Sequence, residues 1–176
     1  MSEYEDLNEN TERAKEPFDK KVAVTMAIIA AALAIVSVLG QIFATEELLA
    51  QQQSSDQWAF YQAKSIRRYE SDIARDIFKA MQNYEGNANV AEKYASNLDR
   101  YEKEGEEIQK EAEKLGDESK LKGREALRLH IGEVFLEIGI VFASLAILTK
   151  RSLVWSASII SACVGIGIAA TAVFIR

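Results

Sequence analysis

Three long apolar runs constrain this chain more than any other feature of its 176 residues. The first covers residues 22–44 and the third covers residues 153–175, and neither contains a charged side chain. The second covers residues 131–149 and contains two carboxylates, Glu133 and Glu137. About 20 helical residues, at about 1.5 Å each, cross the roughly 30 Å hydrocarbon core of a bilayer. The runs therefore predict three transmembrane helices.

Composition excludes several classes of function. One Cys and one His cannot supply the three or four ligands of the common zinc sites. The net charge of −6 argues against a nucleic-acid partner. The sequence has no Gly-rich phosphate loop, nucleophile elbow or His-Glu-x-x-His motif. We therefore expect no metal, no cofactor and no enzymatic activity.

The segment before the first apolar run is acidic. Residues 1–16 have mixed charge and few apolar side chains, which predicts a disordered tail. Pro17 suits the first turn of a helix, because the N–H that it lacks has no helical partner there. The run is also longer than the apolar region of a cleaved signal peptide. We therefore expect a retained first membrane helix over residues 17–44.

Basic residues near the span ends indicate an orientation. Lys20 and Lys21 precede the first span, and a short basic turn, residues 150–152, joins the second span to the third. Lys and Arg in short loops favour the cytoplasmic side. These signals place the N-terminus and the turn in the cytoplasm, and the segment 45–130 on the outer side.

The polar segment 45–130 favours helix, since it lacks Pro and is rich in Glu, Lys, Ala and Gln. A turn signal at residues 83–87 divides it into two arms of about 60 Å each. The heptad phase breaks at Gly116-Asp117, and Gly123 weakens it further, so we expect a kink or short break there. The predicted fold is all-α: three transmembrane helices, with a long extramembrane antiparallel helical hairpin, a coiled-coil-like stalk, between the first and the second.

Heptad spacing marks the predicted seam of the stalk. In the second arm one heptad position holds small or apolar residues (Ala91, Leu98, Gly105 and Ala112), and the other holds larger ones (Tyr94, Tyr101, Ile108 and Leu115). The first arm has a looser stripe (Ala59, Ala63, Ile66, Tyr69, Ile73, Ile77, Ala80 and Tyr84). We expect these stripes to face each other across the hairpin.

Other features predict association between chains. Four aromatic residues remain outside this seam and suggest a second one against neighbouring subunits: Trp58, Phe60, Tyr61 and Phe78. In the third span, a ridge of small residues resembles the close helix packing used in lipid: Ala157, Ser161, Gly165 and Ala169. Gly139 and Ala143 form a similar pair on the second span. These ridges serve either association or packing within one chain.

Residues 56–67 read D-Q-W-A-F-Y-Q-A-K-S-I-R. This run resembles the motif of the bacterial membrane-protein family known as domain of unknown function 4337. The resemblance covers the whole chain, including the short basic turn with a Trp close behind it. It implies an integral protein of the bacterial inner membrane with no assigned activity. It marks five motif positions: Trp58, Tyr61, Gln62, Lys64 and Ser65.

The motif has three interpretations. Trp58 and Gln62 are four residues apart, as are Tyr61 and Ser65, so the pairs occupy adjoining faces of one helix. The first interpretation is a packed base of the stalk, in which polar groups bond to the returning arm. The second is a protein-contact surface, because Trp, Tyr and Arg dominate interface energetics. A small-molecule site is the third and the least favoured.

The carboxylates of the second span are the other candidate site. Glu133 and Glu137 share one helix face, and a charge inside the bilayer usually faces a bundle interior or a water-filled path. With Gln41 at a comparable depth, they form a candidate cation path in an oligomer. In the alternative, Glu133 lies at the headgroup level, and Glu137 is protonated or bonded to Gln41.

The sequence thus supports two hypotheses. The first is a membrane-anchored structural or interaction protein that oligomerises through its stalk and its small-residue spans. Its partners are the lipid bilayer, further copies of itself and an unidentified protein on the stalk. The alternative is a small oligomeric cation channel or transport subunit with a carboxylate-lined path.

Overall fold

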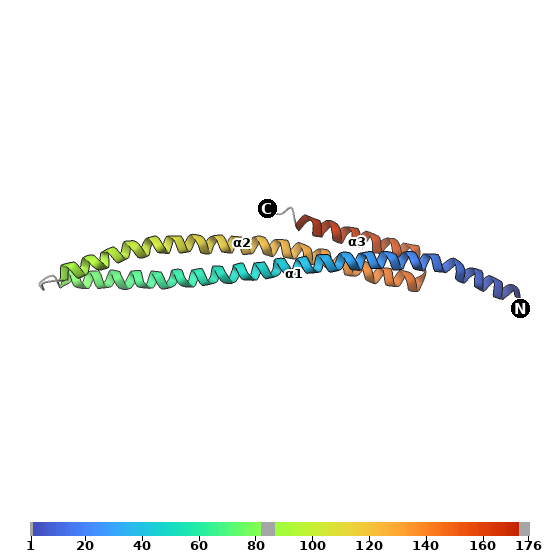
Figure 1. Ribbon diagram of the computed structural model, residues 1–176, viewed down its shortest axis with the longest axis horizontal. Coiled ribbons are helices and arrows are strands. Elements are labelled where there is room, and N and C mark those ends of the chain that lie inside the picture. Colours follow the sequence, from blue (N-terminus) through green and yellow to red (C-terminus); the bar gives the residue numbers. More distant parts are fainter. Residues whose placement is uncertain (1, 82–86, 173–176) are drawn as a thin grey trace. The chain divides into compact units, whose positions relative to one another are not determined.

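The computed structural model describes the backbone of residues 2–81 and 87–172, and side chains from residue 17 onward within these ranges. The described residues form three α-helices and no strand: α1 (Ser2–Ala80), α2 (Asn87–Thr149) and α3 (Ser152–Ala172) (Figure 1). The all-α class predicted from the sequence is confirmed. By length and composition, each of the three helices contains a segment apolar enough to cross a membrane.

The start of α1 differs from the prediction. The helix begins at Ser2 and contains Pro17, whereas the sequence predicted a start near Pro17 after a disordered tail. Residues 2–16 are rich in Glu and also contain Arg, Lys, Ala and Leu, which are strong helix formers. Their propensity favours helix on the N-terminal side of Pro17, although the proline cannot donate a backbone hydrogen bond there.

The break expected in the second arm is absent. α2 is continuous through Gly116 and Gly123. A Cβ atom added at Gly116 would lie 3.3 Å from the Oγ of Ser54, and that hydroxyl donates a hydrogen bond of 2.8 Å to the carbonyl of Ala112. Gly116 therefore allows α2 to approach α1 closely, and it does not end the helix.

Two connections join the helices. The turn predicted at residues 83–87 lies outside the described residues except for Asn87, the first residue of α2. The basic turn between α2 and α3 is confined to Lys150 and Arg151. Lys150 has φ 55°, and its N–H donates a 2.9 Å bond to the carbonyl of Ala146. This is a left-handed helix C-cap, and it allows α3 to begin at Ser152.

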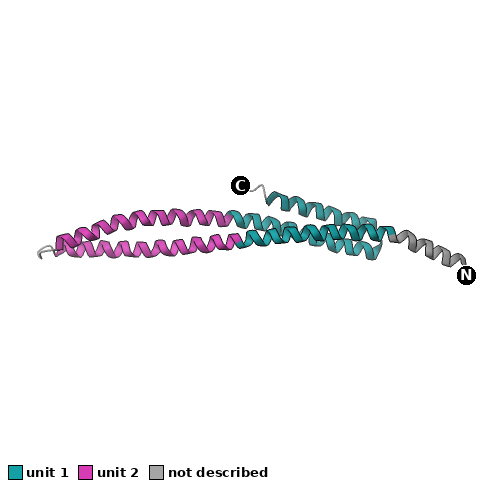
Figure 2. Cartoon of the chain, in the orientation of Figure 1, with its two compact units in different colours: residues 1–45, 121–176 teal, residues 46–120 magenta. Residues whose placement is uncertain are grey.

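The chain divides into two compact units (Figure 2). Unit 1 contains Met1–Thr45 and Leu121–Arg176, and unit 2 contains Glu46–Lys120. On α1, unit 1 ends one residue after the first apolar run, residues 22–44. On α2, unit 1 begins ten residues before the predicted second span, which starts at residue 131.

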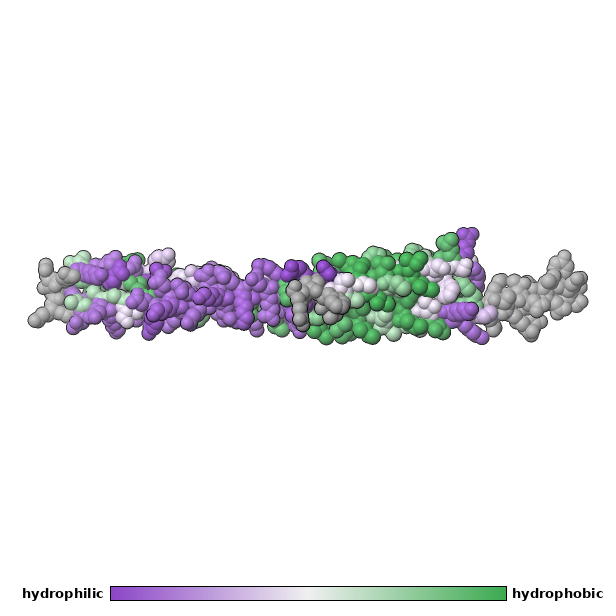
Figure 3. Space-filling model, turned by 90° about the horizontal axis from the view of Figure 1, so that it is seen from above, coloured by the Kyte–Doolittle hydropathy of each residue, from purple (hydrophilic) through white to green (hydrophobic). Residues whose placement is uncertain are grey.

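The core of unit 1 combines small side chains with larger aliphatic ones, namely Val22, Ile29, Val36, Leu129 and Leu136. Most of its buried apolar residues are alanines, including Ala143, Ala146, Ala162 and Ala169. Many of its large aliphatic side chains lie outside and are more than half exposed, on all three helices: Ile28, Ile35, Val141, Leu148 and Ile160. Apolar residues accordingly dominate the face of unit 1 visible in Figure 3.

Candidate functional site

In unit 2, α1 and α2 run antiparallel. Ser54 bonds to the carbonyl of Ala112, and Lys64 forms an ion pair with Glu104. Further along, the rings of Phe78 and Tyr94 stack with centroids 5.9 Å apart and planes at 12°. Residue numbers rise on α1 as they fall on α2, as expected for a hairpin.

The heptad residues of α2 face α1, as predicted. Ala91 and Ala112 are buried, and Gly105 is buried beneath the ring of Tyr61. A Cβ atom added at Gly105 would lie 3.7 Å from that ring, which is ordinary van der Waals contact. Tyr94, at the second heptad position, stacks on Phe78. The seven-residue repeat of this arm therefore identified the correct face of the helix.

The prediction for the first arm is wrong. The stripe expected to face α2 lies on the opposite, exposed face of α1: Ile66, Tyr69, Ile73 and Ile77 are 58%, 66%, 62% and 52% exposed. Ala59, Ala63 and Ala80 are exposed too, and Tyr84 lies outside the described residues. The seam of α1 is instead more polar, and several of its residues contact α2: Ser54, Tyr61, Lys64, Arg68 and Phe78. These hydrogen bonds, ion pairs and ring contacts hold the more polar face of α1 against α2.

Lys64 is the centre of the motif. Its side chain is only 15% exposed and pairs with the carboxylate of Glu104. The Nζ atom also lies 5.4 Å from the ring centroids of Phe60 and Tyr101. Its hydrogen bond to Glu104 lowers the pKa of that carboxyl group, and desolvation opposes the shift. A cation held among two rings and a carboxylate fixes α1 against α2 at this level.

The other motif residues divide between two faces of α1. Tyr61 and Ser65 are half-buried toward α2, whereas Gln62 is exposed. Trp58 is 36% exposed and packs edge-on against Tyr61, with ring centroids 5.7 Å apart. The structure therefore brings Tyr61, Lys64 and Ser65 to the seam and leaves Trp58 and Gln62 outside it.

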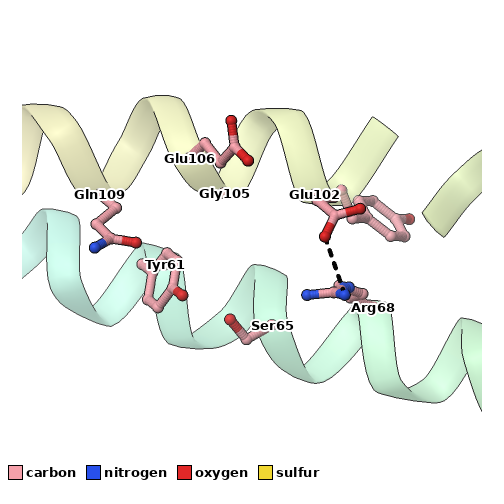
Figure 4. A pocket seen from close by; sticks show the side chains of 8 residues that line it. Tyr61, Ser65, Arg68, Glu102, Gly105, Glu106 and Gln109 are labelled. Atoms are coloured by element: carbon pink, nitrogen blue, oxygen red, sulfur yellow. Dashed lines mark ion pairs between the residues drawn. The ribbon is translucent and has the colours of Figure 1, made fainter. Parts of the chain in front are cut away.

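A small groove follows the seam beside the motif (Figure 4). Its volume is about 210 Å³, and polar side chains line most of it: Tyr61, Ser65, Arg68, Glu102, Glu106 and Gln109. Arg68 and Glu102 close one end with an ion pair of 3.1 Å. Ligand pockets usually enclose about 300–1,000 Å³ and are mostly apolar. The groove is therefore a poor candidate for a small-molecule site.

Glu133 is partnered within unit 1. Its carboxylate lies 3.1 Å from the Nδ1 atom of His130 and also accepts a hydrogen bond from Ser37. A Cβ atom added at Gly40 would lie 3.2 Å from the His130 ring. Sequence reasoning missed Ser37 and His130. The spacing of three residues between His130 and Glu133 was a signal that could have found one of them.

The other two residues of the predicted cation path lie apart. Glu137 is exposed on α2, and Gln41 is exposed on α1. Because Ser37 lies against Glu133 and Gly40 against His130, the antiparallel register places Gln41 on the far side of His130 from Glu137. The structure therefore does not bring Gln41 and Glu137 together.

The small-residue ridge of α3 packs within the chain. Ser161 donates a 2.7 Å hydrogen bond to the carbonyl of Phe135, and Gly165 lies against Gly132. A Cβ atom added at either glycine would lie 2.7 Å from the carbonyl oxygen of the other. Ala169 is buried at the same contact, and Ala157 is half-buried. The ridge thus joins α3 to α2, which leaves it unavailable to another chain.

Among the described residues, no group of three or more His, Cys, Asp or Glu side chains is placed to hold a metal ion. Comparisons with curated proteins and with solved structures give no match. A family model described as domain of unknown function (DUF4337) matches residues 18–175. This match covers both units and the motif at residues 56–67. The chain therefore belongs to the DUF4337 family.

Proposed function

We propose that this chain is a membrane-anchored, non-enzymatic structural or interaction protein. Unit 1 is the anchor, and unit 2 is a helical stalk that assembles with protein partners. The observation that carries the proposal is the surface of unit 1, where large aliphatic side chains are more than half exposed on all three helices. Water-soluble domains rarely expose so much aliphatic surface.

Helix packing in lipid explains such an arrangement. Lipid tails are as apolar as leucine, so burial of large aliphatic side chains gives no driving force there. Close backbone approach between small residues provides van der Waals contact instead, as at the Gly132–Gly165 contact. In water, the same exposed aliphatic surface would promote aggregation. The packing therefore favours a bilayer around unit 1.

The proposed location is the bacterial inner membrane, with the N-terminus in the cytoplasm and the stalk on the outer side. Lys20, Lys21 and the turn at Lys150 and Arg151 support this orientation by the positive-inside rule. The face of unit 2 visible in Figure 3 is mostly polar, which suits an aqueous compartment.

Fractionation and cysteine labelling test this proposal. The full chain should remain in the membrane after an alkaline carbonate wash and dissolve only in detergent. In a Cys163→Ser background, Lys103→Cys in the stalk should react with an impermeant maleimide in spheroplasts. Arg151→Cys in the basic turn should react only after lysis. Release by carbonate would contradict the anchor, and the reverse labelling pattern would contradict the orientation.

A cation path is the second candidate, and Glu137 is the observation that favours it. This carboxylate is exposed on unit 1 within the second predicted span, and a charge at such depth costs at least a few kcal/mol in lipid. An oligomer that encloses Glu137 around water would remove that cost. Glu133 contributes less to this hypothesis because its carboxylate is already bonded to His130 and Ser37.

Liposomes that contain the purified protein test the cation path. Cation flux should fall by about tenfold in Glu137→Gln if the carboxylate lines the path. Glu118→Gln removes an equal charge from the exposed stalk surface and serves as the control. No flux from the assembled wild-type protein, or equal flux in both variants, would exclude this candidate.

A further inference from the structure

The exposed face of α1 in unit 2 carries an apolar stripe that no described residue of the chain covers. The α1 stripe consists of Ala59, Ala63, Ile66, Ile73, Ile77 and Ala80, all of which are exposed. Its three isoleucines are each more than half exposed, and Tyr69 flanks them. Monomeric soluble proteins rarely expose large apolar patches, and where one occurs it usually marks an interface.

The spacing of the stripe has the periodicity of a coiled coil. Successive members are four, three, seven, four and three residues apart, and the gap of seven contains Glu70 at the missing core position. The repeat therefore spans three heptads, with one charged residue in the core. Seven-residue spacing keeps such a stripe against a partner helix over its whole length.

The remaining stalk surface cannot cover this stripe. Among the described residues of α2 in unit 2, no large apolar side chain is exposed, and the outer positions are mainly Glu, Lys and Asp. Beyond the stripe and Tyr69, the large apolar side chains exposed on the described part of the stalk do not form a heptad row of this length: Leu48, Leu49, Trp58 and Phe60 of α1, and Met81 directly after it. In an assembly of identical chains, the surface that matches the α1 stripe is therefore another α1 stripe. Such an interface is isologous, because both copies contribute the same residues.

We propose that the α1 stripe docks on the α1 stripe of a second copy of this chain, parallel and in register. The parallel direction rests on the proposed function, since two copies anchored in one membrane extend their stalks the same way. Ile66, Ile73 and Ile77 then form core layers between the copies. α2 lies on the outside of each hairpin, with its charged face toward water.

Glu70 gives the interface its register and limits its strength. In the parallel arrangement, the two Glu70 side chains occupy the same layer. A polar residue at a single core position specifies alignment at a cost in stability. A parallel pairing shifted by one heptad would place Glu70 opposite Ala63 or Ile77, and a centred antiparallel pairing would place Ile73 opposite Ile66 and not opposite itself. The proposal therefore predicts that removing this charge strengthens the assembly.

Cysteine cross-linking in membranes tests the arrangement. In the full chain with Cys163→Ser, Ile73→Cys should give a disulfide-linked dimer under mild oxidation, because residues in one core layer lie within disulfide distance. Lys79→Cys on α1 outside the stripe and Lys103→Cys on α2 are matched exposed controls. The dimer yield at residue 73 should exceed both by about tenfold. Equal yields at all positions, no dimer, or a product with another mass would overturn the proposal.

Native mass spectrometry of the detergent-solubilised chain gives an independent measurement. Glu70→Leu should strengthen self-association by about tenfold, and Ile73→Glu should weaken it by at least that factor. Both positions are exposed within one chain, so helicity by circular dichroism should stay unchanged. Weaker association in Glu70→Leu would contradict the stripe interface. The same variants should also remain in washed membranes. Retention in the membrane without the expected change in self-association would contradict the stripe interface alone, whereas release from the membrane would contradict the anchor.

Discussion

Single glycines decide how closely the helices of unit 1 approach. Gly132 and Gly165 face each other so closely that a Cβ atom on either would lie 2.7 Å from a backbone carbonyl oxygen. Gly167, two residues further along α3, has no heavy atom of the described residues within 4 Å of its added Cβ atom. The packing of α3 on α2 therefore requires a glycine at position 165 but not at position 167.

This difference predicts opposite effects of one substitution. Gly165→Ala should destabilise the packing of α3 on α2 by about 1–3 kcal/mol, because backbone atoms cannot move aside as a flexible side chain can. Gly167→Ala should be neutral or stabilise α3 by up to about 1 kcal/mol through helix propensity. Thermal unfolding in detergent measures both. Equal unfolding temperatures for the two variants would contradict the contact.

Lys64 makes the stability of the stalk depend on pH. The folded-state pKa of Glu104 is lowered by its bond to Lys64. The pair therefore stabilises the stalk above the unfolded pKa of a glutamate, about 4.3, and this stabilisation is lost as the pH falls through the lower folded pKa.

Lys64→Met tests this dependence. At pH 7 the variant should unfold at a lower temperature than the wild type, and the difference should shrink as the pH approaches 3. Lys120→Met is the control, because Lys120 and Asp117 form an exposed pair that contributes little. A gap between Lys64→Met and the wild type that stays constant from pH 7 to pH 3 would show that the pair has no such role.

At the scale of elements, the turn between α2 and α3 depends on one backbone conformation. Lys150 adopts φ 55° and also pairs with Asp19 of α1. Trp155, early in α3, donates a 3.3 Å hydrogen bond to Thr25 and packs edge-on against Phe18. The turn thus connects two helices and is fixed against the third.

Two substitutions separate the backbone effect from the ion pair. Lys150→Asn and Lys150→Val both remove the charge, but asparagine tolerates a left-handed conformation and a β-branched residue does not. Lys150→Val should therefore be less stable than Lys150→Asn by about 1–2 kcal/mol in thermal unfolding. If the two variants melt together, the conformation of residue 150 does not limit the turn.

At the scale of the whole molecule, the chain consists of two compact units that share two helices. Unit 2 has its own seam, with an ion pair at Lys64, stacked rings at Phe78 and a buried hydroxyl at Ser54. Unit 1 depends on α3, whose residues cover Gly132 and Gly139 of α2. Removal of α3 should therefore affect one unit only.

A chain that ends at Lys150 tests this independence. Its amides in unit 1 should exchange hydrogen faster, because α2 loses the packing of α3. Amides near Ser54, Lys64 and Phe78 should keep their wild-type protection. Faster exchange throughout unit 2 would show that the stalk depends on α3.

Local patterns predicted much of the fold. The apolar runs identified the three long helical segments, because the length needed to cross a bilayer is fixed by helix geometry. The short basic turn at Lys150 was located almost to the residue. The break predicted at Gly116 is absent. A glycine within a helical segment can either end the helix or allow a neighbouring helix to approach closely, and the contact of Gly116 with Ser54, 62 positions earlier, shows the second role.

The sequence alone determined the helices and the apolar stripes along them, since both follow from residues a few positions apart. It could not determine which stripe of α1 faces α2, because both faces have seven-residue spacing. Tertiary structure selected the more polar face, where Lys64 meets Glu104 and Tyr61 covers Gly105, about 40 positions away in the chain. Such contacts depend on matched shape and charge between two helices, and the same selection left the apolar stripe of α1 exposed.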